Sequence, residues 1–308
     1  MAASASPWLL LGATGQVGFE LARTLWWLGD GHAPDRIRLD LSDLERVEAW
    51  LAEHRPAVVV NAAAYTAVDQ AEQESSQAFL LNARLPALLA DYCAAQGALL
   101  VHYSSDYVYS GEGNTPWREG DVARPLSVYG RSKLAGDQAI IDSGCDHLIF
   151  RTSWVYSERG HNFVKTMLRL GSDHDSPHES QHDSLRVVSD QLGVPTSARM
   201  IAEATSLALQ RYRQDPSVAG LYHLAPRGTT SWHGVACEIF RQGPELGHAL
   251  RMTPDRVVAI ASDDYPTSAR RPLNSRLDAS RFATTFEVTL PSWQALLRQT
   301  LQTIHRSP

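Results

Sequence analysis

Two side chains suited to proton transfer, Tyr129 and Lys133, stand four residues apart in this chain of 308 residues. On a helix this spacing places both side chains on one face, about one turn apart. A cation beside a phenol stabilises the phenolate, so we expect Lys133 to lower the pKa of Tyr129 from its reference of about 10 toward neutral pH. General acid–base catalysis needs such a pKa. Taken alone, the pattern Tyr-x-x-x-Lys more often indicates two exposed side chains on the surface of one helix.

The sequence Ser104-Ser105-Asp106 gives the pair a context, because it follows an apolar run that begins at Leu99. In open α/β sheets, ligands bind outside the carboxyl ends of the strands. A hydroxyl at that place can hydrogen-bond a carbonyl oxygen. Ser105 therefore joins Tyr129 and Lys133 as a candidate catalytic residue.

A glycine-rich turn follows the first apolar run, residues 8–11, and precedes a helical pattern. Its glycines are spaced three apart: Gly12, Gly15 and Gly18. Glycine permits positive φ and lets the backbone approach a pyrophosphate, while the N–H groups of Gln16 and Val17 at the helix start can bind its oxygens. We expect Gly15→Val to abolish cofactor binding, because valine resists positive φ and fills the space. A plain tight turn is the alternative reading.

The residues expected at the adenosine end of the cofactor, about twenty positions later, are irregular. Arg36, Arg38, Asp40 and Leu41 all compete for this place. Asp40 favours a bare ribose, as in NADH, whereas Arg36 or Arg38 favours the 2′-phosphate of NADPH. The sequence leaves the choice between NADPH and NADH open.

Strand-like and helix-like segments alternate regularly along the first half of the chain. Strands are predicted at 8–11, 57–60, 99–101 and 147–150, and helices at 17–28, 43–54, 77–96 and 128–141. This alternation is typical of a parallel sheet covered by helices on both faces. We predict an α/β fold with a Rossmann-type doubly wound sheet and a smaller C-terminal substrate-binding lobe.

The predicted boundary between the two units lies near residue 160. Residues 1–160 form the predicted NAD(P)-binding domain, with later segments near 185–225 returning to it, and residues 161–308 form most of the substrate-binding lobe. Further helices are predicted at 197–212, 230–240 and 290–304, most of them in the lobe.

The polar segment 172–184 contains three histidines, His174, His178 and His182, among acidic residues. Pro177 breaks any helix that would align them, and metal sites need rigid convergent ligands. We therefore interpret this segment as a solvated loop that is dispensable for activity, and we predict no metal.

Composition excludes several classes of partner. The formal charge of −6 comes from mixed signs without a basic stripe, which argues against nucleic acid. The cysteines Cys93, Cys145 and Cys237 are far apart and odd in number, which favours a reducing cytoplasmic setting. The early apolar run is too short for a signal peptide or a membrane span.

Several longer motifs resemble the dTDP-4-dehydrorhamnose reductase family of the extended short-chain dehydrogenases. They include VVVNAAAYTAVDQAE, HYSSDYVY, YGRSKLAGD, FRTSWVY, DQLGVPT and ARRPLNSRLD, in this order along nearly the whole chain. The resemblance implies reduction of a dTDP-linked 4-keto-6-deoxy sugar by NADPH or NADH, and a homodimer. In some members of the family glutamates bind magnesium at a dimer contact. Here Glu20 matches one of them, but Arg199 replaces another.

The resemblance also assigns roles to individual residues. It implies that Ser105 orients the substrate, Tyr129 transfers the proton and Lys133 holds the nicotinamide ribose, with Asn82 completing a proton relay. The residues implied to line the cofactor are Ala64, Tyr65 and Thr66, those implied to contact the sugar nucleotide are Asp106 and Trp154, and Arg270 and Arg271 are candidates to clamp its diphosphate. Capping for Asn82, core packing for Trp154 and surface ion pairing for the two arginines are the alternatives.

Two other functions remain open at this point. The chain can be another extended short-chain dehydrogenase acting on a sugar nucleotide, such as an epimerase or a dehydratase. A dehydratase needs a second acid after Asp106, where this chain has Tyr107, so simple reduction is favoured. A non-catalytic regulatory subunit of the same fold is the other alternative, and retention of the Ser, Tyr and Lys side chains argues against it.

Overall fold

A computed structural model describes residues 7–172 and 184–306 of the chain. The predicted loop and its three histidines lie outside these residues, apart from the two ends of the segment. Over the described ranges, no helix combines the length and the apolar composition needed to cross a membrane.

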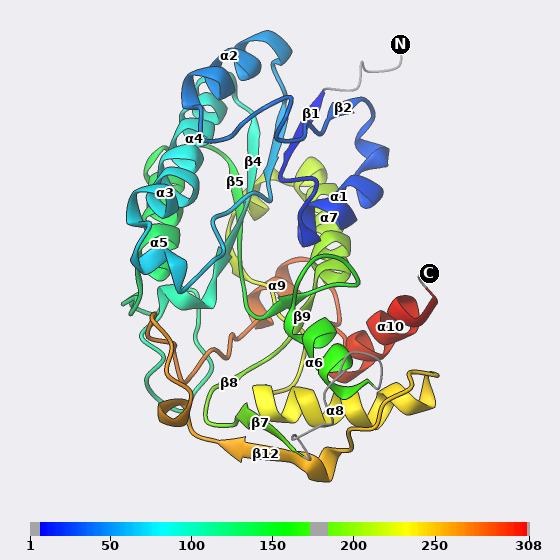
Figure 1. Ribbon diagram of the computed structural model, residues 1–308. Helices are drawn as coiled ribbons and strands as arrows, with labels where there is room; N and C mark the ends of the chain where they lie inside the picture. The colour runs from blue at the N-terminus through cyan, green and yellow to red at the C-terminus, as the bar shows by residue number, and fades with distance from the viewer. Residues whose placement is uncertain (1–6, 173–183, 307–308) are drawn as a thin grey trace.

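A parallel sheet forms the centre of the molecule (Figure 1). Its strands are β1 (Trp8–Leu11), β2 (Gly31–His32), β3 (Val58–Asn61), β4 (Leu99–Ser105), β5 (His147–Thr152) and β10 (Gly220–His223). They stand in the order β10-β5-β4-β3-β1-β2, and every neighbouring pair is parallel. The chain passes from β1 to β2 on one side of β1 and then crosses to β3 on the opposite side of β1. In open α/β sheets, such a reversal of strand order creates a ligand-binding crevice at the carboxyl ends of the strands, here those of β1 and β3.

Helices cover both faces of this sheet (Figure 1). One face carries α2 (Leu44–His54), α3 (Ser75–Phe79), α4 (Leu85–Gln96) and α5 (Val128–Asp142), and the other carries α1 (Gln16–Thr24) and α7 (Ala198–Gln214). Leu9 and Leu11 of β1 pack with the first set, whereas Leu10 packs with the second. Because both faces are buried, the strands are nearly continuous apolar runs. The predicted doubly wound fold is confirmed.

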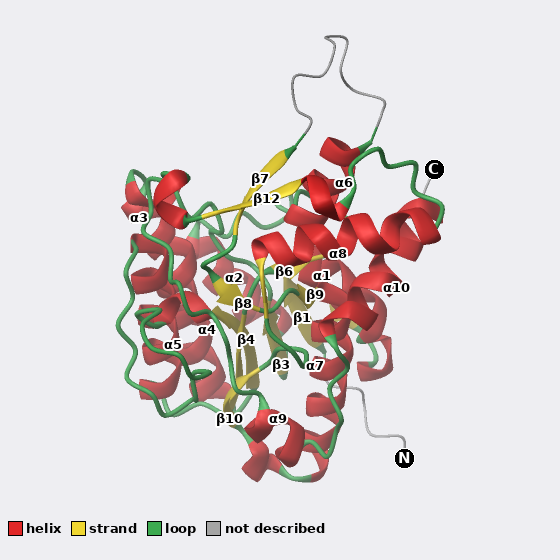
Figure 2. Cartoon of the chain, turned by 90° about the horizontal axis from the view of Figure 1, so that it is seen from below, coloured by secondary structure: helices red, strands yellow, loops and turns green. Residues whose placement is uncertain are grey.

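A smaller lobe lies beyond the carboxyl ends of the strands (Figures 1 and 2). Its elements are β6 (Val155–Tyr156), α6 (Phe163–Gly171), β7 (Leu185–Val188), β8 (Leu192–Gly193), β9 (Thr196–Ser197), β11 (Thr230–Ser231), α8 (Trp232–Glu245), β12 (Val257–Ile260) and α10 (Trp293–Arg306). Met167, Phe240 and Leu297 belong to its own apolar core. Helix α9 (Ser280–Thr285) instead inserts Phe282 against Phe150 of the central sheet.

One helix differs from the sequence-based expectation. The helix predicted at 77–96 is divided into α3 and α4 by one π-helical turn, Leu80–Arg84, which tertiary contacts impose and which helical periodicity does not encode. The helix predicted at 197–212 is α7, which packs on α1 against the central sheet, in the part of the chain (185–225) expected to return to the first domain. Strand β2 is only two residues long, in line with the irregular sequence there.

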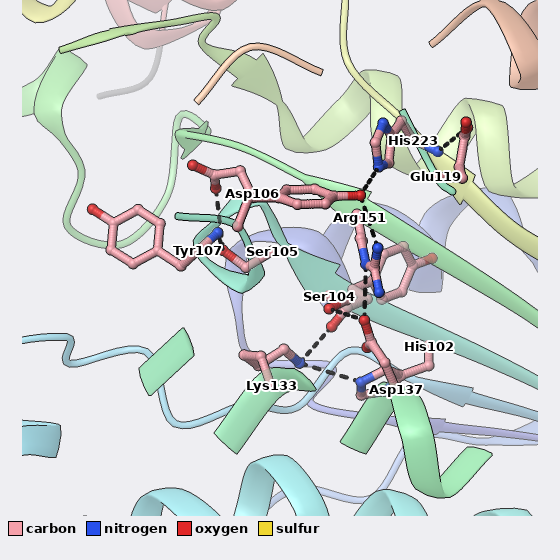
Figure 3. Close-up of polar contacts among 12 residues, drawn as sticks. His102, Ser104, Ser105, Asp106, Tyr107, Glu119, Lys133, Asp137, Arg151 and His223 are labelled. Carbon is pink, nitrogen blue, oxygen red and sulfur yellow. Dashed lines mark hydrogen bonds and ion pairs between the residues drawn. The ribbon is translucent and has the colours of Figure 1, made fainter. Parts of the chain in front are cut away.

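A buried ion pair ties α5 to the sheet (Figure 3). Arg151 of β5 donates from Nε to Asp137 of α5 at 3.0 Å, and Ser104 of β4 donates to the same carboxylate oxygen at 2.9 Å. The other end of Arg151 donates to the hydroxyl of Tyr109 at 2.8 Å. The two charged side chains are 6% and 1% exposed, so each needs the other as its partner.

We predict that Arg151→Met lowers the free energy of unfolding by about 3–5 kcal/mol, because it leaves the Asp137 carboxylate buried without its cation. The matched control is Arg298→Met, which removes an ion pair with Glu245 whose side chains are 45% and 53% exposed. This exposed pair is expected to contribute about 0–1 kcal/mol. Urea unfolding measures both, and equal losses would contradict the structural role of the buried pair.

Candidate active site

A cavity of about 1320 Å³ opens at the carboxyl ends of β1, β3 and β4. The predicted site residues that line it are Gly12, Gly15, Gln16, Val17, Asp40, Leu41, Ala64, Tyr65, Thr66, Tyr129 and Lys133. The structure therefore brings together the glycine-rich turn, the adenosine-end candidates and the Tyr/Lys pair. Its extent along the sheet edge suits an elongated ligand.

The glycine-rich turn keeps the backbone exposed at the start of α1. Gly12 has φ of +81°, and a Cβ there would lie 2.6 Å from the amide nitrogen of Ala63. A Cβ at Gly18 would lie 2.0 Å from the Gly12 carbonyl oxygen, so only glycine at position 18 lets α1 pack this closely against the turn. The first helical hydrogen bond runs from Phe19 N to Gly15 O, which leaves the N–H groups of the first helical turn available to an anion.

Gly15 does not have the positive φ that the sequence led us to expect. It is the N-cap of α1 with φ of −77°, and the nearest atom to a Cβ there is 3.3 Å away. The left-handed conformation belongs to Gly12, which must reverse the chain direction after β1. Gly15 still lines the cavity, so any effect of valine there comes from its bulk alone.

The adenosine-end candidates form a linked group at the rim of the cavity. Asp40 accepts hydrogen bonds from the amide and the hydroxyl of Ser42, at 3.0 and 2.7 Å, and lies 3.6 Å from the Arg36 guanidinium. These bonds from Ser42, together with Arg36, hold the pKa of Asp40 below its usual value. Arg36, Asp40 and Leu41 all line the cavity, so the structure keeps both readings of the ribose contact open.

Lys133 is buried beneath the cavity, with only 1% of its side chain surface exposed. Its Nζ donates to the carbonyl oxygen of Tyr103 at 2.6 Å and lies 3.2 Å from His102 Nε2 (Figure 3). Burial lowers the pKa of Lys133 to about 8, and the nearby Asp137 carboxylate opposes this shift.

The pKa of the Tyr129 phenol is raised, contrary to the expected depression by Lys133. Burial of the phenol is the largest cause, and a hydrogen bond with Ser105 acts in the opposite direction. The reason is geometric: the Lys133 ammonium points to the Tyr103 carbonyl and to His102. In the free protein Tyr129 is therefore a protonated phenol, the form that a proton donor needs.

Ser105 ends β4 beside Tyr129 and begins a polar turn. Its hydroxyl donates to Asp106 Oδ1 at 3.1 Å and accepts from the amide of Tyr107 at 3.2 Å. Asp106 is 2% exposed, and its Oδ2 has no hydrogen-bond partner. Burial raises the pKa of this carboxyl to about 7, so Asp106 exchanges its proton near neutral pH.

Asn82 is fully buried in the π-helical turn and makes three hydrogen bonds. Its amide accepts from the backbone N–H of Tyr65 at 2.9 Å and donates to the Tyr65 carbonyl at 3.0 Å. It also donates to the hydroxyl of Ser132 on α5 at 3.0 Å. These bonds hold the segment that carries Tyr65 against the cavity. A local π-helical turn at such a place is a frequent feature of functional sites.

A second cavity, of about 970 Å³, is lined by the segments 110–114, 190–192 and 265–271, and both Arg270 and Arg271 belong to its wall. Arg271 forms an ion pair with Asp69 at 2.6 Å and donates to the Tyr107 hydroxyl at 3.1 Å. The Tyr107 ring in turn meets the Tyr129 ring edge to face, with centroids 5.6 Å apart. The arginine-lined cavity is therefore connected by side-chain contacts to the proton-transfer pair.

Trp154 stacks on Trp232, with ring centroids 3.9 Å apart, and lines a small cavity of about 80 Å³. Its φ of +48° is uncommon for a large side chain and marks a strained position. Neither of the two larger cavities has Trp154 in its wall as described.

The sequence interpretation missed several polar groups of the site. His102 contacts Lys133, and Asn61 contacts His102. Their polarity could have revealed them in the sequence. A histidine within the buried run of β4 and an asparagine at the end of β3 are unusual in apolar strands. The resemblance had placed Asp69 beside the sugar nucleotide, but it gave no sign of the ion pair with Arg271. Over the described residues, no cluster of three metal-ligating side chains is present.

A family model described as the RmlD substrate binding domain matches residues 7–306. Over 298 residues, covering 95% of this chain and 96% of the relative, the sequence is 44% identical to the dTDP-4-dehydrorhamnose reductase of Shigella flexneri. The chain belongs to the dTDP-4-dehydrorhamnose reductase family. The resemblance based on its motifs is thereby confirmed.

Solved structures of family members share the whole fold. The reductase from Clostridium acetobutylicum has a TM-score of 0.84 and 32% identity, with 97% of this chain and 99% of that chain covered. The reductase from Bacillus anthracis, solved in complex with NADP, has a TM-score of 0.82 and 30% identity, with 96% and 98% covered.

We predict that Asp106→Asn gains stability relative to the native chain as the pH rises from 5 to 8. The native fold raises the pKa of Asp106 from 3.8 to about 7, so its contribution is fully present below the unfolded pKa and is lost as the pH rises through the folded one. Between pH 5 and pH 8 the loss is about 2–3 kcal/mol, because about two units of the shift lie above pH 5. Urea unfolding at both pH values measures it. A stability difference that does not change with pH would contradict the raised pKa.

Proposed function

We propose that this protein reduces the 4-keto group of dTDP-4-dehydro-β-L-rhamnose to dTDP-β-L-rhamnose, with NADPH or NADH as reductant. The observation that carries the proposal is that Tyr129 and Lys133 line the same cavity as the glycine-rich turn, with Ser105 hydrogen-bonded to the Tyr129 phenol. The family supports it, since its members include named dTDP-4-dehydrorhamnose reductases and one complex with NADP.

The cavity fits a nicotinamide dinucleotide on the evidence of its own backbone. Gly12 and Gly18 leave room that a Cβ would fill, and the N–H groups of Gln16 and Val17 face the turn as phosphate donors. Asp40 and Leu41 would hold the adenosine end, and the segment at Ala64, Tyr65 and Thr66 would line the middle. When bound, the reduced nicotinamide supplies the hydride.

Tyr129 supplies the proton to the substrate oxygen. Its raised pKa keeps the phenol protonated until negative charge develops on that oxygen. Ser105, which shares a hydrogen bond with the same phenol, orients the keto group. Lys133 would hold the nicotinamide ribose, and its positive charge would favour the tyrosinate that forms.

The second cavity is our proposed site for the sugar nucleotide. Arg270 and Arg271 offer guanidinium groups whose paired N–H donors match a diphosphate. The ion pair between Arg271 and Asp69 orients that guanidinium beside Tyr107, next to the proton donor. We propose that Asp106 contacts the sugar. We also propose that Trp154 contacts the edge of the sugar from outside the lining of this cavity.

These assignments divide cofactor binding and substrate binding between the two parts of the chain. Residues 1–160, with returning segments near 185–225, bind NAD(P), and most of residues 161–308 bind the substrate. A homodimer and a cytoplasmic location complete the proposal. In support of the latter, the described structure leaves Cys93 and Cys145 as buried free thiols.

Tyr129→Phe keeps the aromatic ring but removes the proton. We predict that kcat falls by about two to four orders of magnitude while the apparent substrate affinity changes little. The measurement is substrate-dependent oxidation of NADPH, and of NADH, which also ranks the two cofactors.

Tyr92→Phe is the matched control, because the hydroxyl of Tyr92 on α4 donates to the carbonyl of Pro56 before β3, at the end of the strand opposite the site. It is expected to leave turnover unchanged. Near-native turnover by Tyr129→Phe would contradict the assigned proton donor. Sugar conversion without net cofactor oxidation would identify an epimerase or a dehydratase, and nucleotide binding without turnover would identify a regulatory subunit.

A further inference from the structure

A line of hydrogen bonds runs beneath the site from β3 to β4 and ends at Lys133. The Ala63 N–H donates to Asn61 Oδ1 at 3.2 Å, and Asn61 Nδ2 lies 3.2 Å from His102 Nδ1. His102 Nε2 lies 3.2 Å from Lys133 Nζ, which donates to the Tyr103 carbonyl at 2.6 Å. The strand register places Asn61 directly opposite His102. All three side chains are at most 1% exposed.

The backbone fixes the direction of this line at both ends. The Ala63 amide can only donate, so Asn61 presents its oxygen to it and its NH₂ group to His102. His102 Nδ1 must then accept, which places the single proton of the neutral ring on Nε2. Burial and the nearby Lys133 lower the pKa of His102 well below its usual value, which keeps the ring neutral.

The His102 Nε2–H therefore points at Lys133 Nζ. A neutral amine accepts this hydrogen bond with its lone pair and still donates to the Tyr103 carbonyl. An ammonium has no lone pair, so two donors then face each other. Every donor in the line meets an acceptor only when Lys133 is neutral.

We propose that Asn61 and His102 are positioning residues that stabilise the neutral amine of Lys133 and so set the protonation state of this lysine in the active site. The proposal rests on the proposed reductase function. When Lys133 is deprotonated, one N–H bond of its ammonium breaks and the proton passes to water in the cavity that Lys133 lines. The lone pair left on Nζ then accepts the Nε2–H of His102.

The other groups around Lys133 agree with this role. Asp137, one turn further along α5, favours the ammonium, but its carboxylate is shared with Arg151 of β5 and Ser104 of β4. Asp106 follows β4, and Tyr129 lies on the same helix as Lys133. The balance leaves Lys133 with a pKa of about 8, close enough to neutral pH for the amine to form during turnover.

The chain offers a direct test, because it contains only two lysines, Lys133 and Lys165. Lysine labelled with ¹³C at Cε gives two NMR signals, which Lys165→Arg assigns. Asn61→Asp keeps the acceptor for Ala63 but requires a proton on His102 Nδ1, so Nε2 becomes an acceptor for the ammonium. We expect this variant to raise the pKa of Lys133 by about one unit or more and to move the pH–rate profile the same way.

The double variant Asn61→Asp/His102→Phe separates the hydrogen-bond line from the added charge. We expect the effect of Asn61→Asp on Lys133 to be clearly smaller in the His102→Phe background, since the ring no longer relays it. An equal effect in both backgrounds would mean a charge effect alone and would overturn the proposal, as would an unchanged pKa in Asn61→Asp.

The unmodified protein provides a second measurement that needs no variant to fold. In ¹⁵N-labelled histidine spectra, His102 is expected as the neutral Nε2–H tautomer, and an Nδ1–H tautomer would overturn the proposal. These spectra do not depend on turnover. A protein with the expected spectra but without reductase activity would refute the proposed function, whereas an active protein with the wrong tautomer would refute this inference.

Discussion

The close approach of α5 to the turn after β4 and to the π-helical turn is the constraint on which the site depends. Cβ atoms added at Gly130 and Gly136 would lie 2.2 Å from the Tyr107 carbonyl oxygen and 2.1 Å from the Asn82 carbonyl oxygen. Only glycine allows the helix to pass so near these backbones. At this separation Lys133 is buried against the sheet, and its charge must be matched by neighbours rather than by water.

That burial explains the unusual polarity of the surrounding strands. The Lys133 side chain of the helix donates to the Tyr103 carbonyl and lies beside His102. The Asp137 carboxylate of the same helix accepts from Ser104 of β4. Their chemistry has a functional consequence: Tyr129 holds its proton, Lys133 can release one, and Asp106 titrates near neutral pH. Perturbed groups gathered in one cleft are typical of catalytic sites.

Local features of the sequence predicted much of this structure. Alternating helical and apolar segments identified the sheet, because both of its faces are buried, and glycine spacing identified the turn before α1. The positive φ was assigned to Gly15 instead of Gly12 because spacing does not reveal which residue reverses the chain. The lysine–histidine–asparagine line, the Asp137–Arg151 pair and the Asp69–Arg271 pair join segments distant in sequence, and a single sequence does not encode which distant residues meet.

The central claim is that the cofactor cavity and the arginine-lined cavity, which are linked through Tyr107 and Tyr129, hold cofactor and substrate so that hydride and proton reach one carbonyl group. The most direct test supplies NADPH deuterated at C4, in each stereoisomer, with the 4-keto sugar nucleotide and locates the label in the product by NMR. The account predicts deuterium at C4 of the sugar from one stereoisomer only, with the hydroxyl proton drawn from solvent. A reduced product without deuterium at C4 would contradict direct transfer and the arrangement described for this site.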